Sequence, residues 1–243
     1  MAASQILSCP QFPFIPLQMN STLQDQLGLG RTDLEYRFTL LCKIGFTAEM
    51  LEVFQAMKAY TSIVEKYQDG STTEPDLCRI SNQRNFVQHR LLSLLPVRNL
   101  DQGFRISHPV YEICRLTGLI FGVGVIFPLP AQTAPLPTLV RLLQAELQES
   151  SLESDWWFPD AVEVLIWVLT LGRIAATGLP NRTWFVAALG RVTACCGLSS
   201  RWRDLKPVLD GILWLDCACD FGGQQLWEEV DRYVSGDATR SRV

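Results

Sequence analysis

The stretch "AVEVLIWVLTLGRIAA", residues 161–176, decides the fold. It is apolar on nearly every side of a helix, with only Glu163 and Arg173 charged, and such a helix belongs in the interior of a protein. Asp160 and Glu163 form a D-x-x-E start that resembles a capping box, and Gly178 supplies a stop signal. The stretch therefore predicts a central helix with other helices packed around it.

The helical period recurs along most of the chain, and a strand period is almost absent. A stripe of apolar residues runs through one predicted helix, which Thr47 can cap. The stripe consists of Met50, Val53, Phe54, Met57, Tyr60, Val64 and Tyr67. Further helices are expected at about residues 86–95, 107–128, 139–147, 182–196, 201–218 and 221–234. The sequence thus predicts an all-α fold, a compact array of about eight helices around central apolar helices.

Glycines interrupt the helix expected over residues 107–128, which Ser107 and Pro109 would start. We interpret Gly118, Gly122 and Gly124 as points of close approach between helices. A nucleotide-binding loop is the alternative, but "GVGVIF" has Phe127 where the third glycine of a dinucleotide fingerprint belongs. The shorter helix that follows presents an apolar face of Leu139, Leu142, Leu143 and Leu147.

The composition fits a folded chain that does not bind nucleic acid directly. Of its 243 residues, 48% are hydrophobic and 19% are charged, which is ample material for a core. The net charge is −4, so the basic surplus that stand-alone nucleic-acid binding requires is missing. We divide the chain into a Pro- and Phe-containing arm (residues 1–32), a helical domain (33–236) and a flexible tail (237–243).

Neither secretion nor membrane insertion is expected. The first residues lack a positive region and are interrupted by prolines, which argues against a signal peptide. The apolar run from Leu119 to Phe127 has nine residues, whereas a spanning helix needs about 20. We therefore expect a soluble chain in a reducing compartment, and the sequons at Asn20 and Asn181 as chance matches.

The segment "LWLDCACD", residues 213–220, looks at first like a metal or redox site. On a helix, Cys217 and Cys219 point about 200° apart, so they cannot share one ion. Asp216 and Asp220 stand four residues apart, but a second carboxylate cluster that would complete a magnesium site of the terpene-cyclase kind is not apparent. We expect no metal and no cofactor, and we interpret the eight cysteines of the chain as free thiols, most of them buried.

The same segment is predicted instead to form a corner between two helices. Trp214 and Trp227 would point inward as anchors, and Asp220 would cap the final helix. The acids of the segment would pair locally. Their candidate partners are Arg201, Arg203 and Lys206.

No catalytic constellation stands out, and we expect no catalytic residues and no enzyme activity. His89 and His108 have no acidic residue at metal-binding spacing, and we interpret them as ordinary surface or cap-region histidines. Neither a nucleophile elbow of the G-x-S-x-G type nor a phosphate-binding G-x-x-x-x-G-K loop occurs.

Three blocks of sequence carry a family resemblance. They are "HPVYEICRLTGLIFGVGVIFPLP" (108–130), "VLIWVLTLGRIAATGLPNRTWFVAAL" (164–189) and "WRDLKPVLDGILWLDCACDFGGQQLWEEV" (202–230). The signature residues in them are Tyr111, Glu112, Cys114, Arg115, Trp167, Gly172, Trp184, Phe185, Trp214, Asp216, Cys219, Asp220, Trp227 and Glu229. In this order the blocks resemble the fungal-specific transcription factor domain, the regulatory region that follows the zinc-cluster DNA-binding domain of fungal transcription factors.

The resemblance implies a helical regulatory module that acts in the nucleus, through protein contacts or small effectors, in control of a metabolic or secondary-metabolite pathway. The family's zinc cluster needs six closely spaced cysteines, whereas residues 1–100 hold only Cys9, Cys42 and Cys78. We therefore expect neither zinc binding nor direct DNA binding. Arg173 stands where the family tends to have glycine, and in so apolar a helix it should reach a carboxylate or the surface.

Two other functions stay open. An apolar pocket would make the chain an effector-binding protein for a small metabolite, although the aromatic residues concerned are more often plain core. These residues are Trp156, Trp157, Trp167, Trp184 and Phe185. The third possibility is an all-α enzyme of unrecognised type. Apart from the family resemblance, the expected location of the chain is the cytoplasm. For the regulatory module we expect a protein partner or self-association, because it is shorter than the family's usual helical region and should expose apolar surface.

Overall fold

The structure, a computed structural model, describes residues 46–70, 77–107, 110–129, 135–150, 159–195 and 202–240. Within these ranges the chain is helical and contains no strand, so the prediction of an all-α fold is confirmed. The α-helices are α3 (Ala48–Gln68), α4 (Leu77–Ser93), α5 (Gln102–Ser107), α6 (Tyr111–Phe121), α7 (Leu136–Glu149), α8 (Pro159–Ala175), α9 (Arg182–Cys195), α10 (Trp202–Ile212) and α11 (Asp216–Arg240). A 3₁₀ turn, η1 (Val97–Asn99), and a π-helical turn, η2 (Gly122–Ile126), complete the set. The expected arm, residues 1–32, lies outside the described residues.

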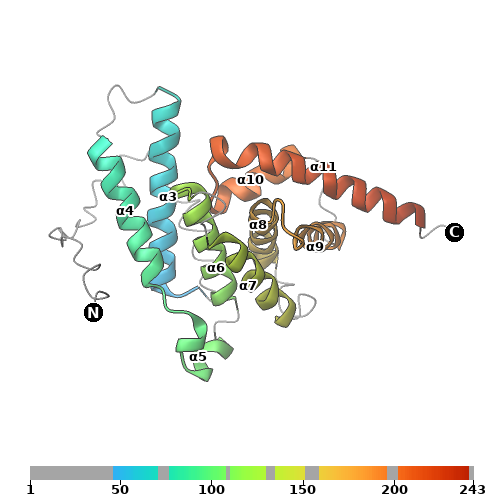
Figure 1. The fold of residues 1–243 in the computed structure, drawn as a ribbon, viewed down its shortest axis with the longest axis horizontal. Helices are drawn as coiled ribbons and strands as arrows, with labels where there is room; N and C mark the ends of the chain where they lie inside the picture. Colours follow the sequence, from blue (N-terminus) through green and yellow to red (C-terminus); the bar gives the residue numbers. More distant parts are fainter. Residues whose placement is uncertain are drawn as a thin grey trace, which may run out of the picture.

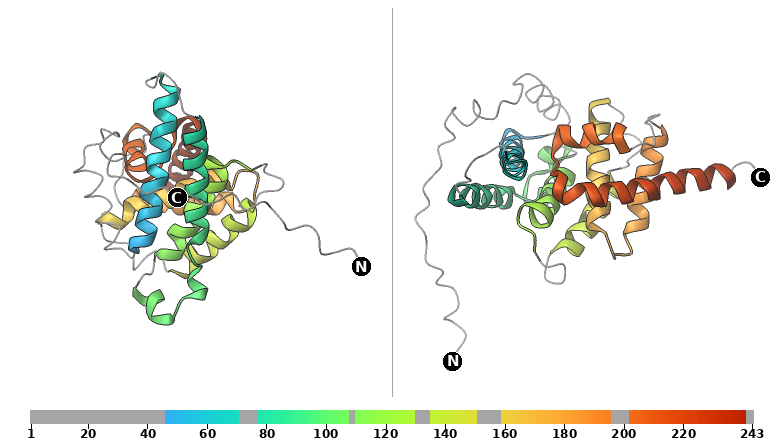
Figure 2. Two further views of the ribbon diagram at one scale, coloured as in Figure 1. Left: turned by 90° about the vertical axis from the view of Figure 1, so that its left-hand side faces the viewer. Right: turned by 90° about the horizontal axis from the view of Figure 1, so that it is seen from above.

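Helix α8 occupies the centre of the fold, as its all-round apolar sequence predicts (Figure 1). It packs against α6 and α7 on one side and against α9, α10 and α11 on the other. All seven residues from 165 to 171 are buried. The first two helices of the described ranges, α3 and α4, lie side by side, and α4 packs against this body at α6 and η2 (Figures 1 and 2). No helix in the described ranges combines the length and the apolar run that crossing a membrane requires.

Helix α3 forms where its stripe and its cap predict. The Thr47 hydroxyl accepts a hydrogen bond from the Met50 amide at 3.1 Å, which satisfies one of the free amides at the helix start. The stripe is buried through Tyr60, but Val64 is half-buried and Tyr67 is exposed. The stripe therefore contacts the core along only part of its length. Gly70, with φ +67°, ends the segment in a conformation that suits glycine.

Several predicted helix boundaries were wrong. Helix α4 begins at Leu77 rather than near residue 86. Its first turns are polar, so the apolar pattern did not reveal where the helix begins. Ser107 ends α5 instead of capping the next helix, and α6 begins at Tyr111 without a side-chain cap. Leu142, expected on the apolar face of α7, is exposed, while Val140 takes its place in the core.

The glycines of α6 and η2 mostly do what we expected. A Cβ added at Gly118 would lie 3.3 Å from the Phe54 ring, and one at Gly122 would lie 2.7 Å from Leu91 Cδ2. These two glycines therefore let α6 approach α3 and α4 closely. Gly124 does not, because the nearest atom to a Cβ there is Leu136 Cδ1 at 4.0 Å.

The corner near the end of the chain lies earlier than predicted. Helix α10 ends at Ile212 and α11 begins at Asp216, so the turn comprises residues 213–215. Asp220 is inside α11 and is not its cap. The helix also continues through Gly236 to Arg240, into the segment expected as a tail, and it projects beyond α9 (Figures 1 and 2). The predicted capping box of the central helix was also misplaced. Helix α8 begins at Pro159, so Asp160 lies inside the helix rather than before it.

Candidate functional site

The first signature block fastens the start of α6 to the segment that follows α4. Glu112 and Arg115 form a buried ion pair, with Arg115 Nε 2.8 Å and Nη2 2.6 Å from the two carboxylate oxygens. Glu112 also accepts a hydrogen bond from the Val97 amide at 3.0 Å, and the Tyr111 hydroxyl donates to the Leu95 carbonyl at 3.0 Å. These charged groups are satisfied by protein atoms, which is how buried charges are tolerated. The block therefore works as a structural clamp.

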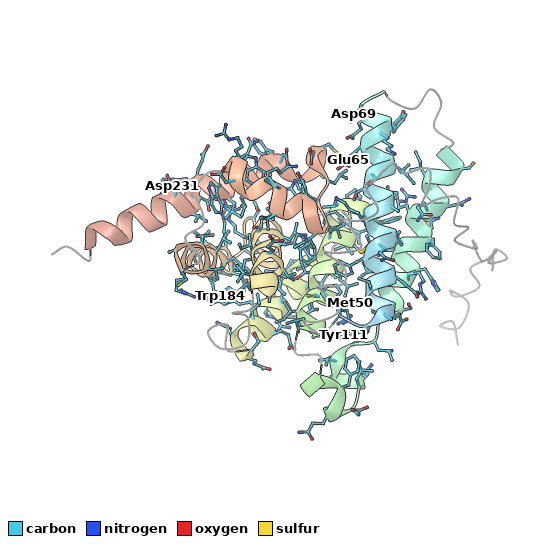
Figure 3. The ribbon with its side chains drawn as sticks, turned by 180° about the vertical axis from the view of Figure 1, so that it is seen from behind. Met50, Glu65, Asp69, Tyr111, Trp184 and Asp231 are labelled. Atoms are coloured by element: carbon cyan, nitrogen blue, oxygen red, sulfur yellow. The ribbon has the colours of Figure 1, made fainter. Side chains whose placement is uncertain are left out.

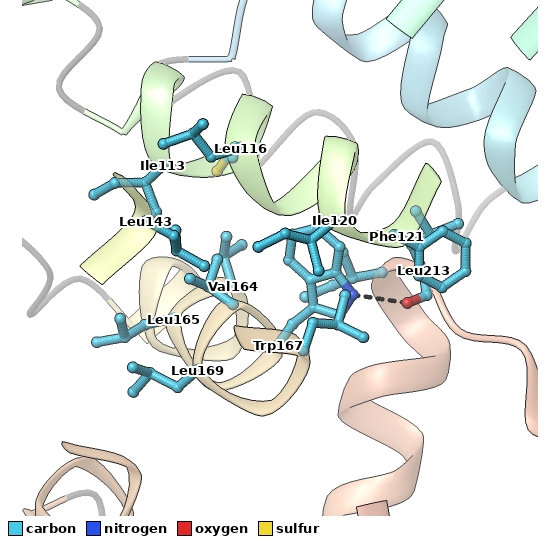
Figure 4. Packing of buried hydrophobic residues seen from close by; sticks show 14 of the residues in the cluster. Ile113, Leu116, Ile120, Phe121, Leu143, Val164, Leu165, Trp167, Leu169 and Leu213 are labelled. Atoms are coloured by element: carbon cyan, nitrogen blue, oxygen red, sulfur yellow. Dashed lines mark hydrogen bonds between the residues drawn. The ribbon is translucent and has the colours of Figure 1, made fainter. Parts of the chain in front are cut away.

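The second block reaches the third through a tryptophan. Trp167 is fully buried on α8, and its Nε1 donates to the Leu213 carbonyl at 2.7 Å (Figure 4). Leu213 is the first residue after α10, so its carbonyl belongs to the turn between α10 and α11. The hydrogen bond fixes the α10–α11 corner against the central helix.

A second link between these blocks consists of charges. Arg173 on α8 and Arg182 at the start of α9 both form ion pairs with Glu229 on α11. Burial lowers the pKa of Arg173, while Glu229 opposes that change. Burial would raise the pKa of Glu229, but hydrogen bonds from Arg182 and Arg173 outweigh it and hold the pKa below its ordinary value. The expectation that Arg173 reaches a carboxylate is thus confirmed.

Two glycines of the second and third blocks lie in close contact with aromatic side chains. A Cβ at Gly172 would lie 2.5 Å from Phe185 Cε1, and one at Gly223 would lie 2.4 Å from Trp202 Cη2. Phe185 meets Trp184 edge to face at 5.0 Å between ring centroids, an arrangement that stabilises aromatic pairs. The interior around these residues is therefore closely packed.

These contacts bear on the pocket considered for an effector. Trp167 and Phe185 are fully buried core residues, and Trp184 is half-buried on α9. Trp156 and Trp157 lie outside the described residues. The structure brings Trp167 and Phe185 into the core, and neither exposes a ring face to a ligand.

The "LWLDCACD" segment holds a network of charges around one lysine. Lys206 Nζ lies 2.5 Å from Asp210 Oδ1, 2.7 Å from Asp216 Oδ1 and 3.8 Å from Asp220 Oδ1. Burial lowers the pKa of Lys206, but hydrogen bonds with Asp210 and Asp216 outweigh this and raise it. Asp220 also accepts a hydrogen bond from Trp214 Nε1 at 2.7 Å. Of the three candidate partners, Lys206 pairs with these acids, and Arg201 lies outside the described residues.

Both tryptophans of the corner point inward, as predicted. Trp214 and Trp227 are buried, and Trp214 lies against Trp202 with 6.0 Å between ring centroids. Asp220 therefore accepts a hydrogen bond from the buried Trp214 side chain and does not cap the start of α11.

Two charged residues of α3 join this network, and sequence reasoning missed them. Lys58 Nζ donates to the Asp210 carbonyl at 2.7 Å, in the last turn of α10, where a cation is favoured. Burial lowers the pKa of Lys58 and raises that of Glu65. Figure 3 shows Glu65 on the side of α3 toward the α10–α11 corner. Lys58 and Glu65 follow Phe54 by four and eleven residues. This helical spacing is the sequence signal that could have placed them on the same face of α3 as Phe54.

The cysteines do not form a metal site in the described part of the chain. Cys217 is exposed and Cys219 is buried, which confirms that the two face apart on α11. Burial raises the pKa of the Cys219 thiol to about 12 and also raises that of Cys114. Cys78 and Cys195 are exposed as well, so the expectation of mostly buried thiols was wrong for three of the five described cysteines. Within the described ranges no three His, Cys, Asp or Glu side chains are grouped to hold an ion.

The two histidines and the charged signature residues complete the set of candidate residues. His89 is exposed on α4, and His108 lies outside the described residues. Each charged signature residue forms an ion pair: Glu112 with Arg115, Glu229 with Arg173 and Arg182, and Asp216 and Asp220 with Lys206. Such an arrangement fixes helices relative to one another.

Comparison of the chain with protein-family models, with curated proteins and with solved structures finds no match. The class that the structure itself defines is an all-α helical array.

Proposed function

We propose that the chain is a helical regulatory module of the fungal zinc-cluster transcription factor type, which acts in the nucleus through a protein partner and does not bind DNA itself. The observation that carries the proposal is the mutual contact of the signature blocks. Trp167 in the second block bonds to Leu213 in the third, 46 residues away. Arg173 and Arg182 in the second block pair with Glu229 in the third.

This pattern supports the resemblance because signature positions far apart in sequence serve one packing unit. Arg173, the departure from the family pattern, is accommodated by Glu229, itself a signature residue. The pattern thus explains why these residue types are needed together.

The charges favour a protein-contacting role over a DNA-contacting one. The chain carries 21 Lys and Arg against 25 Asp and Glu. A surface that neutralises DNA phosphates needs a basic excess on one face. Three arginines of the blocks, Arg115, Arg173 and Arg182, are instead paired with carboxylates.

A tethered reporter assay tests the proposal. The full chain is fused to an unrelated DNA-binding domain and expressed in fungal cells that carry a reporter gene with the matching operator. We expect the fusion to change reporter output relative to the DNA-binding domain alone, in either direction. The chain without the added domain should leave the reporter unchanged. A nuclear, stably expressed fusion that behaves like the domain alone would contradict the proposal.

A further inference from the structure

The ion-pair cluster around Glu229 contains more positive than negative charge. Arg173 and Arg182 both pair with Glu229, so two cations share a single carboxylate. Among the residues that the structure describes, no second acid pairs with either arginine. Arg173 is buried, whereas Arg182 is half-buried and reaches the surface. The excess positive charge is therefore accessible at Arg182.

Arg182 uses one edge of its guanidinium group for Glu229. Its Nε lies 3.3 Å from Glu229 Oε2, and its Nη2 pairs with Oε1. Its Nη1 donates instead to the Thr177 hydroxyl at 3.3 Å. A guanidinium group carries five N–H donors in a planar fork, so donors remain for a second anion. An anion at Thr177 could therefore bind Arg182 without displacing Glu229.

Thr177 lies on the surface, in the turn between α8 and α9. It follows the end of α8 by two residues, and Gly178, with φ +77°, comes directly after it. Thr177, Gly178 and Pro180 are all exposed. The Thr177 hydroxyl donates to the Ile174 carbonyl at 2.7 Å. A group attached to this oxygen would replace the donated proton, and an anionic group would turn from the carbonyl end of α8 toward Arg182.

We propose that Thr177 is a phosphorylation site, at which a protein kinase transfers the γ-phosphoryl group of a nucleoside triphosphate to the hydroxyl oxygen. A bond forms between the Thr177 oxygen and phosphorus, the bond from phosphorus to the departing nucleoside diphosphate breaks, and the hydroxyl proton passes to the kinase. The phosphate brings about two negative charges at pH 7 and is held by Arg182. Phosphorylation thus links the α8–α9 turn to α11 through Arg182 and Glu229. The site does not depend on the proposed regulatory function, and its tests use no reporter.

Mass spectrometry tests whether the site is used. The full chain is produced in fungal cells that are growing, starved or stressed, purified with phosphatase inhibitors and digested with trypsin. Cleavage after Arg173 and Arg182 releases residues 174–182, "IAATGLPNR", in which Thr177 is the single hydroxyl side chain. We expect a fraction of this peptide to carry one phosphate, which phosphatase removes. A peptide that stays unmodified in all three conditions would overturn the proposal.

Phosphorus NMR tests the role of Arg182. The full chain is made with phosphothreonine incorporated at position 177, and the pH at which the phosphate dianion takes up a proton is followed by its chemical shift. Arg182→Gln should raise the pKa of the phosphate, because a nearby cation favours the doubly charged form. Arg191→Gln, at an exposed arginine of the same helix, should leave this pKa unchanged. A phosphate pKa that is the same with and without Arg182 would overturn the assignment.

Thermal unfolding gives an independent measure of the same contact. Arg182→Gln should lower the midpoint by about 2 °C more in the phosphorylated chain than in the unphosphorylated chain. The reason is that the change then removes a pair with the phosphate as well as the pair with Glu229. Circular dichroism of each chain checks that the fold is kept. Equal losses in the two chains would show that Arg182 does not hold the phosphate.

Discussion

Arg173 on α8 and Glu229 on α11 form an ion pair in which the arginine side chain is only 1% exposed. The pair ties the central helix to the last one, and Arg182 adds a second cation to the same carboxylate. Removing one partner of a buried pair leaves the other charge unsatisfied, which is costlier than the pair is stabilising.

Glu229→Leu should therefore destabilise the chain by about 3 kcal/mol, measured by urea unfolding, because Arg173 stays buried without a partner. Arg182→Gln should cost less than about 1 kcal/mol, since its side chain is 28% exposed. The double variant Arg173→Leu and Glu229→Leu should cost less than the sum of its single changes. Additive costs would show that the two residues are not coupled.

Stability should fall in acid in a way that depends on Glu229. Its pKa in the folded chain lies below the ordinary 4.5, so its contribution is present above pH 4.5 and is lost as the pH falls through the folded-state pKa. Glu65 acts in the opposite direction, because burial raises its pKa and protonation then favours the folded chain. Glu229→Gln should flatten the acid branch of the unfolding free energy plotted against pH. An unchanged slope would contradict the assignment.

Trp167→Phe tests the hydrogen bond that fixes the α10–α11 corner. The change keeps an aromatic ring in the core but leaves the Leu213 carbonyl without its indole donor. We expect a loss of about 1–3 kcal/mol from an unsatisfied buried group, in addition to the smaller ring volume. Trp184→Phe is the matched control, because Trp184 is only half-buried on α9. If both changes cost the same, the corner does not depend on this bond.

Two glycine-to-alanine changes test the packing. Gly172→Ala should destabilise by about 1–3 kcal/mol, because its Cβ would come within 2.5 Å of Phe185. Gly124→Ala should be neutral or slightly stabilising, because its Cβ meets nothing closer than 4.0 Å and alanine is the better helix former. Thermal unfolding of both variants beside the wild type measures the difference. Equal unfolding midpoints would mean that the Phe185 ring moves aside for the added methyl group without loss of stability.

Thiol labelling tests the position of the two cysteines in "LWLDCACD". Cys217 is exposed and should react with a maleimide in the native chain, whereas Cys219 is buried with its pKa raised to about 12. Labelling followed by peptide mass spectrometry should find Cys217 labelled in the native chain, together with the other exposed cysteines Cys78 and Cys195, and Cys219 labelled only in denaturant. Equal native rates would show that α11 is not formed around these residues.

Much of the fold could be predicted from the sequence because its helices are strongly patterned. The all-round apolar run of α8 predicted its central place, and the unusual Arg173 predicted a carboxylate partner. The corner before α11 was placed too late because Asp220 was expected to cap the last helix. Gly222 and Gly223 lie inside α11, where an added Cβ would lie 3.2 Å from Ile174 and 2.4 Å from Trp202 respectively, so these glycines allow close packing.

Other features depend on tertiary contacts that local pattern does not reveal. Lys58 bonds to a carbonyl 152 residues away, and nothing near it in the sequence names that partner. Phe221 reads as an ordinary apolar position of an amphipathic helix, yet it faces solvent. The face that a helix buries is decided by its neighbours, here by Trp202 and Ile174.

The most direct measurement is reporter output from the full chain tethered to an unrelated DNA-binding domain. A regulatory module that acts through a partner should change the output relative to the DNA-binding domain alone. A wild-type fusion that is expressed in the nucleus and leaves the reporter at the level of the DNA-binding domain alone would contradict the regulatory function.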